Sequence, residues 1–390
     1  MRLLVATLLL LALPSVGLGN TLARDPEEEH QPEESEPPRE RFDGTFEIPN
    51  SEITLKLGGY VKLDFIHDFD AIGSEDKFDP STIPTDGSDG ENTRLHAKQS
   101  RLSLDFHRPT RRGPARIFVE SDFFGSGNSL RLRHAFGSVG PLLAGQTWST
   151  FMDEDAIPPT LDFEEPRVFI FVRQAMIRWT WRRSDRLLVA LALEEPDAEI
   201  EPPAGVAGSS EDPLPDLTFR IRRTGGAGHV QFSGFVGQAR FRADEGGEDD
   251  ETIWGINLSG NLAAGGRDRF RFQLAHGDGL ARYRGAPAVA TDENGRLEAI
   301  PTGSITVSYQ HFWNDRLWSH VVYSYGEEDN TAGQGADAIK EVEYAALNLV
   351  WELAEGISVG AEWLYGSRED NGGAAGEANR LQVVFQLGFF

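Results

Sequence analysis

From Thr54 onward, apolar and polar residues alternate along the chain in segments of about ten residues. In one such segment, Leu102, Leu104 and Phe106 alternate with polar residues, and residues 217–222 and 269–274 repeat the pattern. A side-chain period of two places the two sets on opposite faces of a β-strand. No stretch after the first twenty or so residues has the three-to-four spacing of a long amphipathic helix. The pattern therefore predicts an all-β chain.

The alternating segments number about sixteen, and each has room to cross a membrane. Dividing the sequence from Thr54 to Phe390 among them allots about 21 residues to each, enough for a membrane strand of about ten residues and half of its turns. We therefore predict a transmembrane antiparallel β-barrel of about 16 strands in residues 51–390. The predicted strands begin near Leu55, Thr93, Ala115, Leu130, Leu142, Val168, Arg186, Asp216, His229, Thr252, Asp268, Gly303, Arg316, Val342, Gly356 and Arg380.

Long and short connections alternate between these segments. The long ones are acidic and contain Gly or Pro, at residues 67–92, 149–167, 194–215, 243–251, 277–301 and 327–339. The short ones include residues 109–114, 182–185, 224–228 and 264–267. This alternation is typical of outer-membrane barrels, with short periplasmic turns and long extracellular loops. Tryptophans near strand ends, such as Trp179 and Trp181, fit interfacial girdles. A water-soluble secreted β-protein is the alternative, but the strongly charged second face of nearly every segment disfavours it.

The N-terminus carries two segments of different composition. Arg2, the apolar run Leu3–Leu13 and the small residues that follow predict a signal peptide, residues 1–19, that is cleaved on export. A retained anchor is the alternative, but this apolar run is shorter than the roughly 20 residues that span a bilayer. Residues 20–50 are acidic and rich in proline, and we predict that they are disordered. The predicted location is the Gram-negative outer membrane.

Composition narrows the function further. The sequence has no cysteine, which excludes disulfide scaffolds, thiol nucleophiles and Cys-ligated zinc. Its 62 acidic residues against 37 basic ones give a net charge of −25, which disfavours a nucleic-acid partner. The acids gather in the N-terminal segment and the long loops, whereas arginines recur inside the strands. Charge distribution therefore says more about function than net charge does.

Strand arginines are the candidate binding residues. An arginine that faces lipid near the midplane costs about 2–4 kcal/mol, so alternation directs these side chains into the lumen. There they would attract anions and bind carboxylates or phosphates through paired N–H donors. The alternative is that lumenal acids such as Asp105, Glu120, Asp122 and Glu362 neutralise them. The predicted pore-lining residues are Arg101, Arg116, Arg131, Arg133, Arg220, Arg222, Arg269 and Arg271, and Arg173, Arg178, Arg240 and Arg242 occupy similar settings.

The long connection at residues 149–167, called the third loop below, is acidic and partly apolar. Ile157, Leu161 and Phe163 would anchor it to the inner wall. Its acids would then face the arginines across a constriction and select solutes by charge. The constriction residues predicted on this basis are Asp153, Glu154, Asp155 and Asp162. An ordinary external loop is the alternative.

Several motifs resemble the DcaP-type trimeric porins of Gram-negative outer membranes. They are GGYVKLD at residues 58–64, FVESDF at 118–123, SLRLRHAFGSV at 129–139, AGQTWSTFMD at 144–153 and IPPTLDF at 157–163. The resemblance implies a sixteen-stranded barrel, a homotrimer, an inward-folded third loop and uptake of small anions such as dicarboxylates. It implies that Arg131 and Arg133 lie on the pore wall and that residues 153–162 form the constriction. Members often carry an N-terminal coiled coil, which the proline-broken residues 24–50 do not match.

The function predicted from the sequence is a passive porin for small anionic solutes, embedded among outer-membrane lipids. We predict no enzymatic activity, catalytic residue, cofactor or metal site, because no nucleophile elbow or metal-ligand spacing is present. A phosphate- or pyrophosphate-selective porin is an alternative, although lumenal lysines are few (Lys62, Lys98, Lys340). A barrel enzyme or an adhesin with acidic binding loops is an alternative of a different class.

Overall fold

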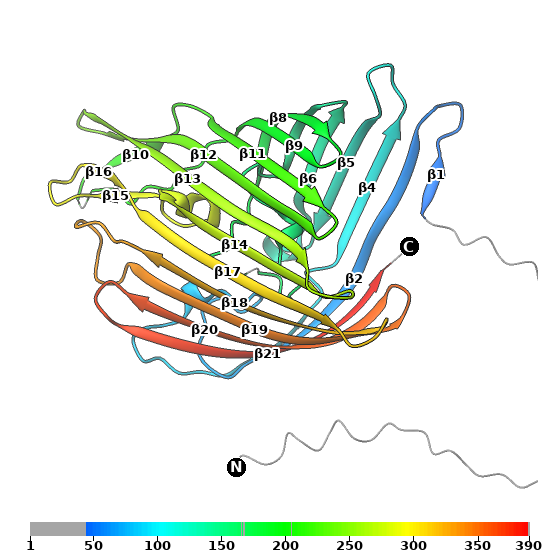
Figure 1. Ribbon diagram of the computed structural model, residues 1–390. Helices are drawn as coiled ribbons and strands as arrows, with labels where there is room; N and C mark the ends of the chain where they lie inside the picture. Colours follow the sequence, from blue (N-terminus) through cyan, green and yellow to red (C-terminus); the bar gives the residue numbers. More distant parts are fainter. Residues whose placement is uncertain (1–43, 165, 167, 204, 389–390) are drawn as a thin grey trace, which may run out of the picture. The chain divides into compact units, whose positions relative to one another are not determined.

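The computed structural model describes residues 44–388 except residues 165, 167 and 204 (Figure 1). The predicted signal peptide, residues 1–19, and residues 20–43 of the predicted disordered segment lie outside the described residues. Within the described residues, sixteen antiparallel strands form the barrel wall. They are β2 (Thr54–Asp68), β4 (Arg101–Arg108), β5 (Ala115–Asp122), β6 (Arg131–Val139), β7 (Leu142–Trp148), β8 (Arg173–Ser184), β9 (Leu187–Glu194), β11 (Asp216–Gly225), β12 (Gly228–Ala243), β13 (Glu248–Ala263), β14 (Arg269–Asp278), β17 (Pro301–Phe312), β18 (Leu317–Glu328), β19 (Ile339–Ala354), β20 (Ile357–Asp370) and β21 (Ala375–Gly388).

The wall closes on itself between its first and last strands. Each wall strand pairs with the next along the chain, and β2 pairs with β4 on one side and β21 on the other. The closing register runs from Tyr60 opposite Gly388 to Asp68 opposite Arg380. Closure satisfies the backbone hydrogen bonds of both edge strands, as a membrane requires. The predicted barrel is therefore confirmed.

Five shorter strands and four 3-10 helices accompany the sixteen wall strands in the described part of the chain. The strands are β1 (Thr45–Glu47), β3 (Asn92–His96), β10 (Gly208–Glu211), β15 (Val289–Thr291) and β16 (Leu297–Ala299). The helices are η1 (Pro80–Thr82), η2 (Ser126–Asn128), η3 (Glu154–Ala156) and η4 (Leu280–Arg284). No helix in the described part of the chain is long and apolar enough to cross a membrane.

Strand β1 lies inside residues 20–50, which the sequence predicts to be disordered. Strand β21 pairs with β2 only from Tyr60 to Asp68. Thr45–Glu47 of β1 pair with the earlier residues Thr54–Lys56, which β21 does not reach. The short strand therefore covers backbone groups of β2 that would otherwise form an open edge. The strand Thr45–Glu47 thus lies before residue 51, where the barrel is predicted to begin.

Most predicted strand starts lie close to the observed ones, and the exceptions have structural causes. The strand predicted near Thr93 is divided into β3 and β4 by residues 97–100. The strand predicted from Val168 begins only at Arg173, because Val168, Phe169 and Ile170 are buried inside the barrel. These three residues have the hydrophobicity of a strand but belong to an inward-folded loop.

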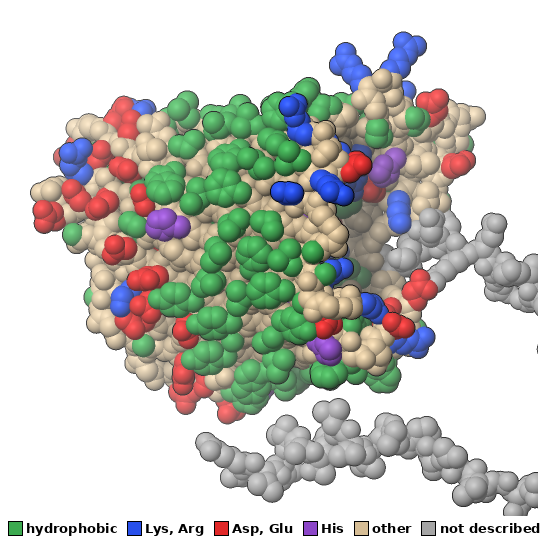
Figure 2. Space-filling model, viewed as in Figure 1, with side chains coloured by type: hydrophobic (Ala, Val, Ile, Leu, Met, Phe, Trp, Pro, Cys, Tyr) green, Lys and Arg blue, Asp and Glu red, His purple; other side chains and the backbone are tan. Residues whose placement is uncertain are grey.

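The outside of the wall carries the apolar set of each alternating segment. Ile177, Trp179 and Trp181 of β8 are 61%, 43% and 44% exposed, and equivalent residues repeat around the barrel. Figure 2 shows a broad band of hydrophobic side chains across one face of the barrel, with acidic side chains gathered beyond it toward the end that carries the long loops. Side chains exposed to this extent on a single-chain barrel are those that contact lipid or another subunit.

Loops fill part of the barrel interior. Phe151, Phe169 and Tyr283, from two different loops, pack with Phe235 and Ile253 of the wall in one buried cluster. Phe78 and Ile83, from the connection between β2 and β3, pack with Tyr344 and Leu364 in a second cluster. The hydrophobic core therefore lies inside the barrel, between the loops and the strands β12–β14 and β18–β21. The opposite wall, β4–β8 with β11, retains an open cavity.

Candidate functional site

The eight predicted pore-lining arginines all lie on the inner face of the wall. Neighbouring residues of a strand point to opposite faces, and each of these arginines stands beside a residue whose side chain is exposed on the outside of the barrel. Leu102 is 47% exposed beside Arg101, Leu132 is 47% exposed between Arg131 and Arg133, and Ile221 is 43% exposed between Arg220 and Arg222. Ile117 next to Arg116 and Phe270 between Arg269 and Arg271 are likewise exposed.

Four of these arginines line one cavity of about 420 Å³. Arg101, Arg116, Arg133 and Arg220 contribute to it, together with Arg178 from β8. Two carboxylates, Glu120 and Glu154, also reach it, as do aromatic side chains including Phe118 and Trp148. The other four predicted arginines lie elsewhere. Arg131 lies over the rings of Phe124 and Phe163, and Arg222 lines a separate cavity of about 210 Å³. Arg271 donates a hydrogen bond to Gln310 at 3.1 Å. Arg269 lies at the start of β14 and is half-buried.

Carboxylates pair with the arginines of strands β4–β6. Arg116 holds Asp105 through two hydrogen bonds of 2.8 and 2.9 Å, and Arg131 holds Asp122 at 3.0 and 2.6 Å. Arg133 bridges Glu120 at 2.7 Å and Asp122 at 2.9 Å. Neutralisation by lumenal acids, the alternative considered above, therefore holds in this part of the wall.

Arg178 and Arg220 differ from that group. Among the described residues, neither forms an ion pair, and Arg178 donates one hydrogen bond of 3.4 Å to the carbonyl of Trp148. The Nε atoms of both are buried without a hydrogen-bond partner in the described structure. A buried donor without a partner costs about 1–3 kcal/mol, so both guanidiniums favour an acceptor in the cavity.

Two further arginines that the sequence groups with this set face the other way. Arg240 and Arg242 belong to the outward row of β12 that contains Phe232 and Val236, and that prediction is wrong. The cause is the length of β12 and β13, which continue past the apolar band toward the long loops. There Arg240 binds Asp250 and Glu248, and Arg242 binds Glu211, in water rather than lipid.

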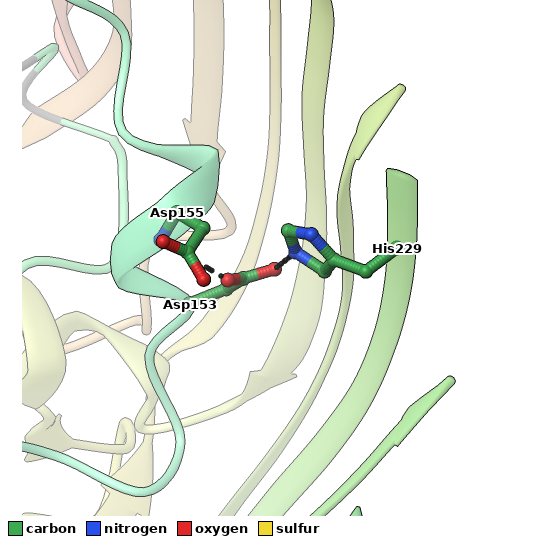
Figure 3. Close-up of side chains that lie close together, drawn as sticks. All are labelled: Asp153, Asp155 and His229. Atoms are coloured by element: carbon green, nitrogen blue, oxygen red, sulfur yellow. Dashed lines mark hydrogen bonds and ion pairs between the residues drawn. The ribbon is translucent and has the colours of Figure 1, made fainter. Parts of the chain in front are cut away.

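The third loop begins with an anchor on strands β12 and β13. Asp153 accepts hydrogen bonds from Ser259 at 2.9 Å and lies 2.8 Å from the His229 Nε2 atom (Figure 3). Burial raises the pKa of Asp153, but the His229 hydrogen bond and the charges of His229 and Arg222 outweigh it and hold that pKa below its usual value. Backbone carbonyls of the same loop accept from the wall as well, including Phe151 from Ser233 at 2.6 Å.

The group in Figure 3 also has the composition of a metal site. Among the described residues, Asp153, Asp155 and His229 offer ligand atoms within 4.8 Å of one another. Arg222, however, contacts Asp155 directly and approaches Asp153 to 3.7 Å. Its guanidinium supplies the positive charge that a metal ion would supply, so we assign the group to loop anchoring.

The second half of the loop is anchored on the opposite wall. Both backbone N–H groups of Leu161 and Asp162 donate to Glu362 at 2.8 Å, and Asn348 holds that carboxylate at 3.0 Å. Asp162 lies 3.5 Å from Arg380, which also binds Asp68. Glu362 therefore holds the loop and does not neutralise a pore arginine.

These anchors divide the four predicted constriction acids into two groups. Asp153 and Asp162 are buried in wall contacts, with 0% and 4% exposure. Glu154 and Asp155 are exposed, and Glu154 faces the cavity that Arg178 and Arg220 line. The predicted apolar anchors also find partners: Ile157 packs against the first buried cluster, and Phe163 stacks on Phe124 with ring centroids 4.0 Å apart.

A second loop inside the barrel was not foreseen from the sequence. Residues 279–300, predicted as an external loop, fold inward, and every residue of η4 is buried. Arg282 binds Asp216 at 2.6 Å, and Tyr283 donates to the same carboxylate at 3.0 Å. The Tyr283 ring packs 4.9 Å from Phe151 of the third loop. Two large apolar residues, Leu280 and Tyr283, inside a polar connection were the signal available in the sequence.

Comparisons with known proteins agree with this architecture. A model of the family described as DcaP outer membrane protein matches residues 43–389. No curated protein matches the sequence. The structure is similar to the crystal structure of the outer membrane channel DcaP of Acinetobacter baumannii, with a TM-score of 0.78, 23% identity, and coverage of 88% of this chain and 99% of that one.

Other solved barrels are more distant. In-vitro folded OmpT of Vibrio cholerae has a TM-score of 0.56 and 12% identity, covering 88% of this chain and 99% of that one. The anion-selective porin from Comamonas acidovorans has a TM-score of 0.59 and 11% identity, covering 87% of this chain and 100% of that one. At these identities the likeness establishes a shared fold.

Proposed function

The chain belongs to the DcaP outer membrane protein family, and from that premise we propose that it admits small anionic solutes such as dicarboxylates by passive diffusion. The observation that carries the proposal is the pair Arg178 and Arg220, which face the cavity with no carboxylate partner among the described residues. Paired guanidinium N–H groups match the geometry of a carboxylate. The pore arginines of strands β4–β6 supply a wall whose charge is largely balanced by Asp105, Glu120 and Asp122.

The third loop sets the size and field of the pathway in this proposal. Its anchors lie on β12–β13 and on β19–β20, so it crosses the interior and leaves a cavity along β4–β8 and β11. Glu154 then faces the arginines across that cavity. An opposing carboxylate limits how strongly an anion is held, and a pore must release its solute as well as attract it.

The predicted homotrimer, the cleaved signal peptide and the absence of enzymatic activity belong to the same proposal. One of the solved OmpT structures from Vibrio cholerae is described as a trimer form, and it shares the fold of this chain. The exposed apolar residues of the outer wall can contact lipid or a second subunit equally well.

Three lysines bear on the phosphate alternative. Lys62 is buried beside Asp64 at 3.2 Å, Lys98 contacts Asp76, and Lys340 binds Glu369 at 2.9 Å. Each is engaged with a carboxylate, and none lines the arginine cavity. They therefore add no second row of cations to the pathway, and we favour carboxylates as the solute class.

Liposome swelling tests the proposal. Vesicles that contain the purified protein are diluted into isosmotic solutions of a C4 dicarboxylate, inorganic phosphate, a neutral sugar of similar size or a dibasic amine. The proposal expects swelling rates in the order dicarboxylate, phosphate, sugar and amine. Faster swelling with the amine than with the dicarboxylate would contradict it.

A further inference from the structure

Three exposed arginines, Arg183, Arg186 and Arg223, gather on two adjacent short turns of the barrel, next to a fourth, Arg182, whose position in the alternation of β8 is that of the inward-facing Arg178. The turns connect β8 to β9 and β11 to β12, and β9 pairs with β11. Arg223 lies opposite Leu187 in that register, and the Thr224 N–H donates to the Arg186 carbonyl at 2.9 Å. The three residues, here called the turn arginines, therefore share one side of the rim.

The turn arginines have no internal partner. Within the described part of the chain, no hydrogen bond or ion pair reaches any of the three guanidiniums, although Asp185 lies in the same turn. The turn between β13 and β14 provides the contrast, because its exposed Arg267 pairs with Asp315 at 2.8 Å. Exposed arginine pairs are worth little for stability, so the missing partners cost the fold nothing.

The position of the patch indicates which partner would meet it. The outward row of β8 ends in Trp179 and Trp181, whose rings lie 6.3 Å apart, and Leu187 and Ile221 continue the apolar surface up to the arginines. Tryptophans on barrels mark the level of the lipid headgroups. Short turns face the periplasm, so this edge meets the inner leaflet.

We propose that the turn arginines bind the headgroups of anionic phospholipids in the periplasmic leaflet of the outer membrane. The apolar residues Leu187 and Ile221 would contact the acyl chains of the same lipid, and the guanidiniums would donate to its phosphate. A basic residue near an anionic membrane surface contributes about a fivefold preference for the charged lipid. The patch uses none of the residues assigned to the pathway, and Arg186 also borders the cavity of about 210 Å³ that Arg222 lines.

Native mass spectrometry of the purified full-length protein in uncharged detergent measures this binding. The protein is titrated with dioleoyl-phosphatidylglycerol, with dioleoyl-phosphatidylcholine, or with inorganic phosphate at the same concentration. The test variant is Arg186→Gln with Arg223→Gln. The matched control is Arg267→Gln with Arg316→Gln, which removes the same charge from the next two short turns along the rim, those between β13 and β14 and between β17 and β18.

The proposal expects the wild-type protein to prefer phosphatidylglycerol over phosphatidylcholine, and the test variant to lose more than about tenfold of that preference. The control should change it less than about twofold, and inorganic phosphate should not displace the lipid. An unchanged preference in the test variant would overturn the proposal, and so would an equal loss in the control. Displacement by inorganic phosphate would show a simple anion site in place of a lipid site.

Discussion

Replacing Arg178 and Arg220 together by glutamine should remove most of the anion preference of the channel. Both guanidiniums line the cavity, and neither is balanced by a carboxylate among the described residues. Neither guanidinium is in contact with a carboxylate, and Glu154 is the acid that faces the two charges across the cavity. The other cavity arginines, such as Arg116 beside Asp105, belong to pairs that are nearly neutral at a distance.

The size of the effect follows from the dimensions of the cavity. A volume of about 420 Å³ corresponds to a sphere of about 5 Å radius, which places each guanidinium about 6 Å from a solute at the centre. At the dielectric constant of water, one charge at that distance contributes about 0.7 kcal/mol. Two charges contribute about 1.4 kcal/mol, or about tenfold in the local anion concentration.

The assay is the reversal potential of the reconstituted channel across a planar bilayer under a potassium chloride gradient. The double variant Arg178→Gln with Arg220→Gln should lower the chloride-to-potassium permeability ratio by about a hundredfold, because the two charges raise the local chloride concentration about tenfold and lower that of potassium by the same factor. The charge-balanced variant Asp105→Asn with Arg116→Gln should change it by less than about twofold, because it deletes a neutral pair. A ratio that stays within twofold in the first variant, or an equal shift in the second, would refute the reasoning.

Four other predictions concern the loops and the wall. Asp153→Asn should raise the single-channel conductance because the third loop loses its first anchor. The pKa of Asp153 lies below the usual 3.8, so the ionised anchor persists at neutral pH and is lost only as the pH falls through that lowered value. The conductance of the wild-type channel should therefore rise only at that acidic pH. Arg282→Ala leaves Asp216 buried without its cation and should cost about 3–5 kcal/mol, seen as a lower urea midpoint of unfolding. Glu154→Gln removes the negative charge opposite the arginines and should raise the chloride-to-potassium ratio about tenfold, whereas an unchanged ratio would place this residue outside the pathway. Gly145→Ala places a Cβ 2.3 Å from a backbone carbonyl at a φ of 126° and should lower the yield of folded barrel on heat-modifiability gels.

The strands were predictable because the membrane imposes the pattern that identifies them. Lipid outside and a polar interior force the period of two, as in Leu217–Arg222, and the observed β11 spans that segment. The inward position of the eight arginines follows from the same alternation. Their neutralisation by Asp105, Glu120 and Asp122 does not follow from the sequence alone, because pairing depends on which strands lie side by side.

The interior loops were harder to predict because composition does not distinguish their surroundings. Residues 149–167 carry both acids and apolar residues, a composition that is compatible with an inward-folded loop and with an ordinary external loop. Residues 279–300 resembled an external loop, yet Tyr283 is fully buried. The partner that holds the third loop, Glu362, lies 200 positions from Asp162 along the chain, and no local pattern links them.

Arg240 and Arg242 show where the alternation itself misleads. The rule that an arginine on a strand faces the lumen applies only within the hydrocarbon layer, because only lipid penalises the outward position. Strand β12 runs from Gly228 to Ala243 and extends beyond the apolar band. Outward residues at its far end are in water and pair with acids of β10 and β13.

The reversal potential of the unmodified channel under a tenfold potassium chloride gradient tests the central claim most directly. The proposed pathway predicts that chloride is more permeant than potassium, because unbalanced arginines line the cavity although the whole chain carries a net charge of −25. A potential of that sign should weaken as ionic strength rises, since salt screens the arginines. A reversal potential that shows potassium to be the more permeant ion would contradict the account.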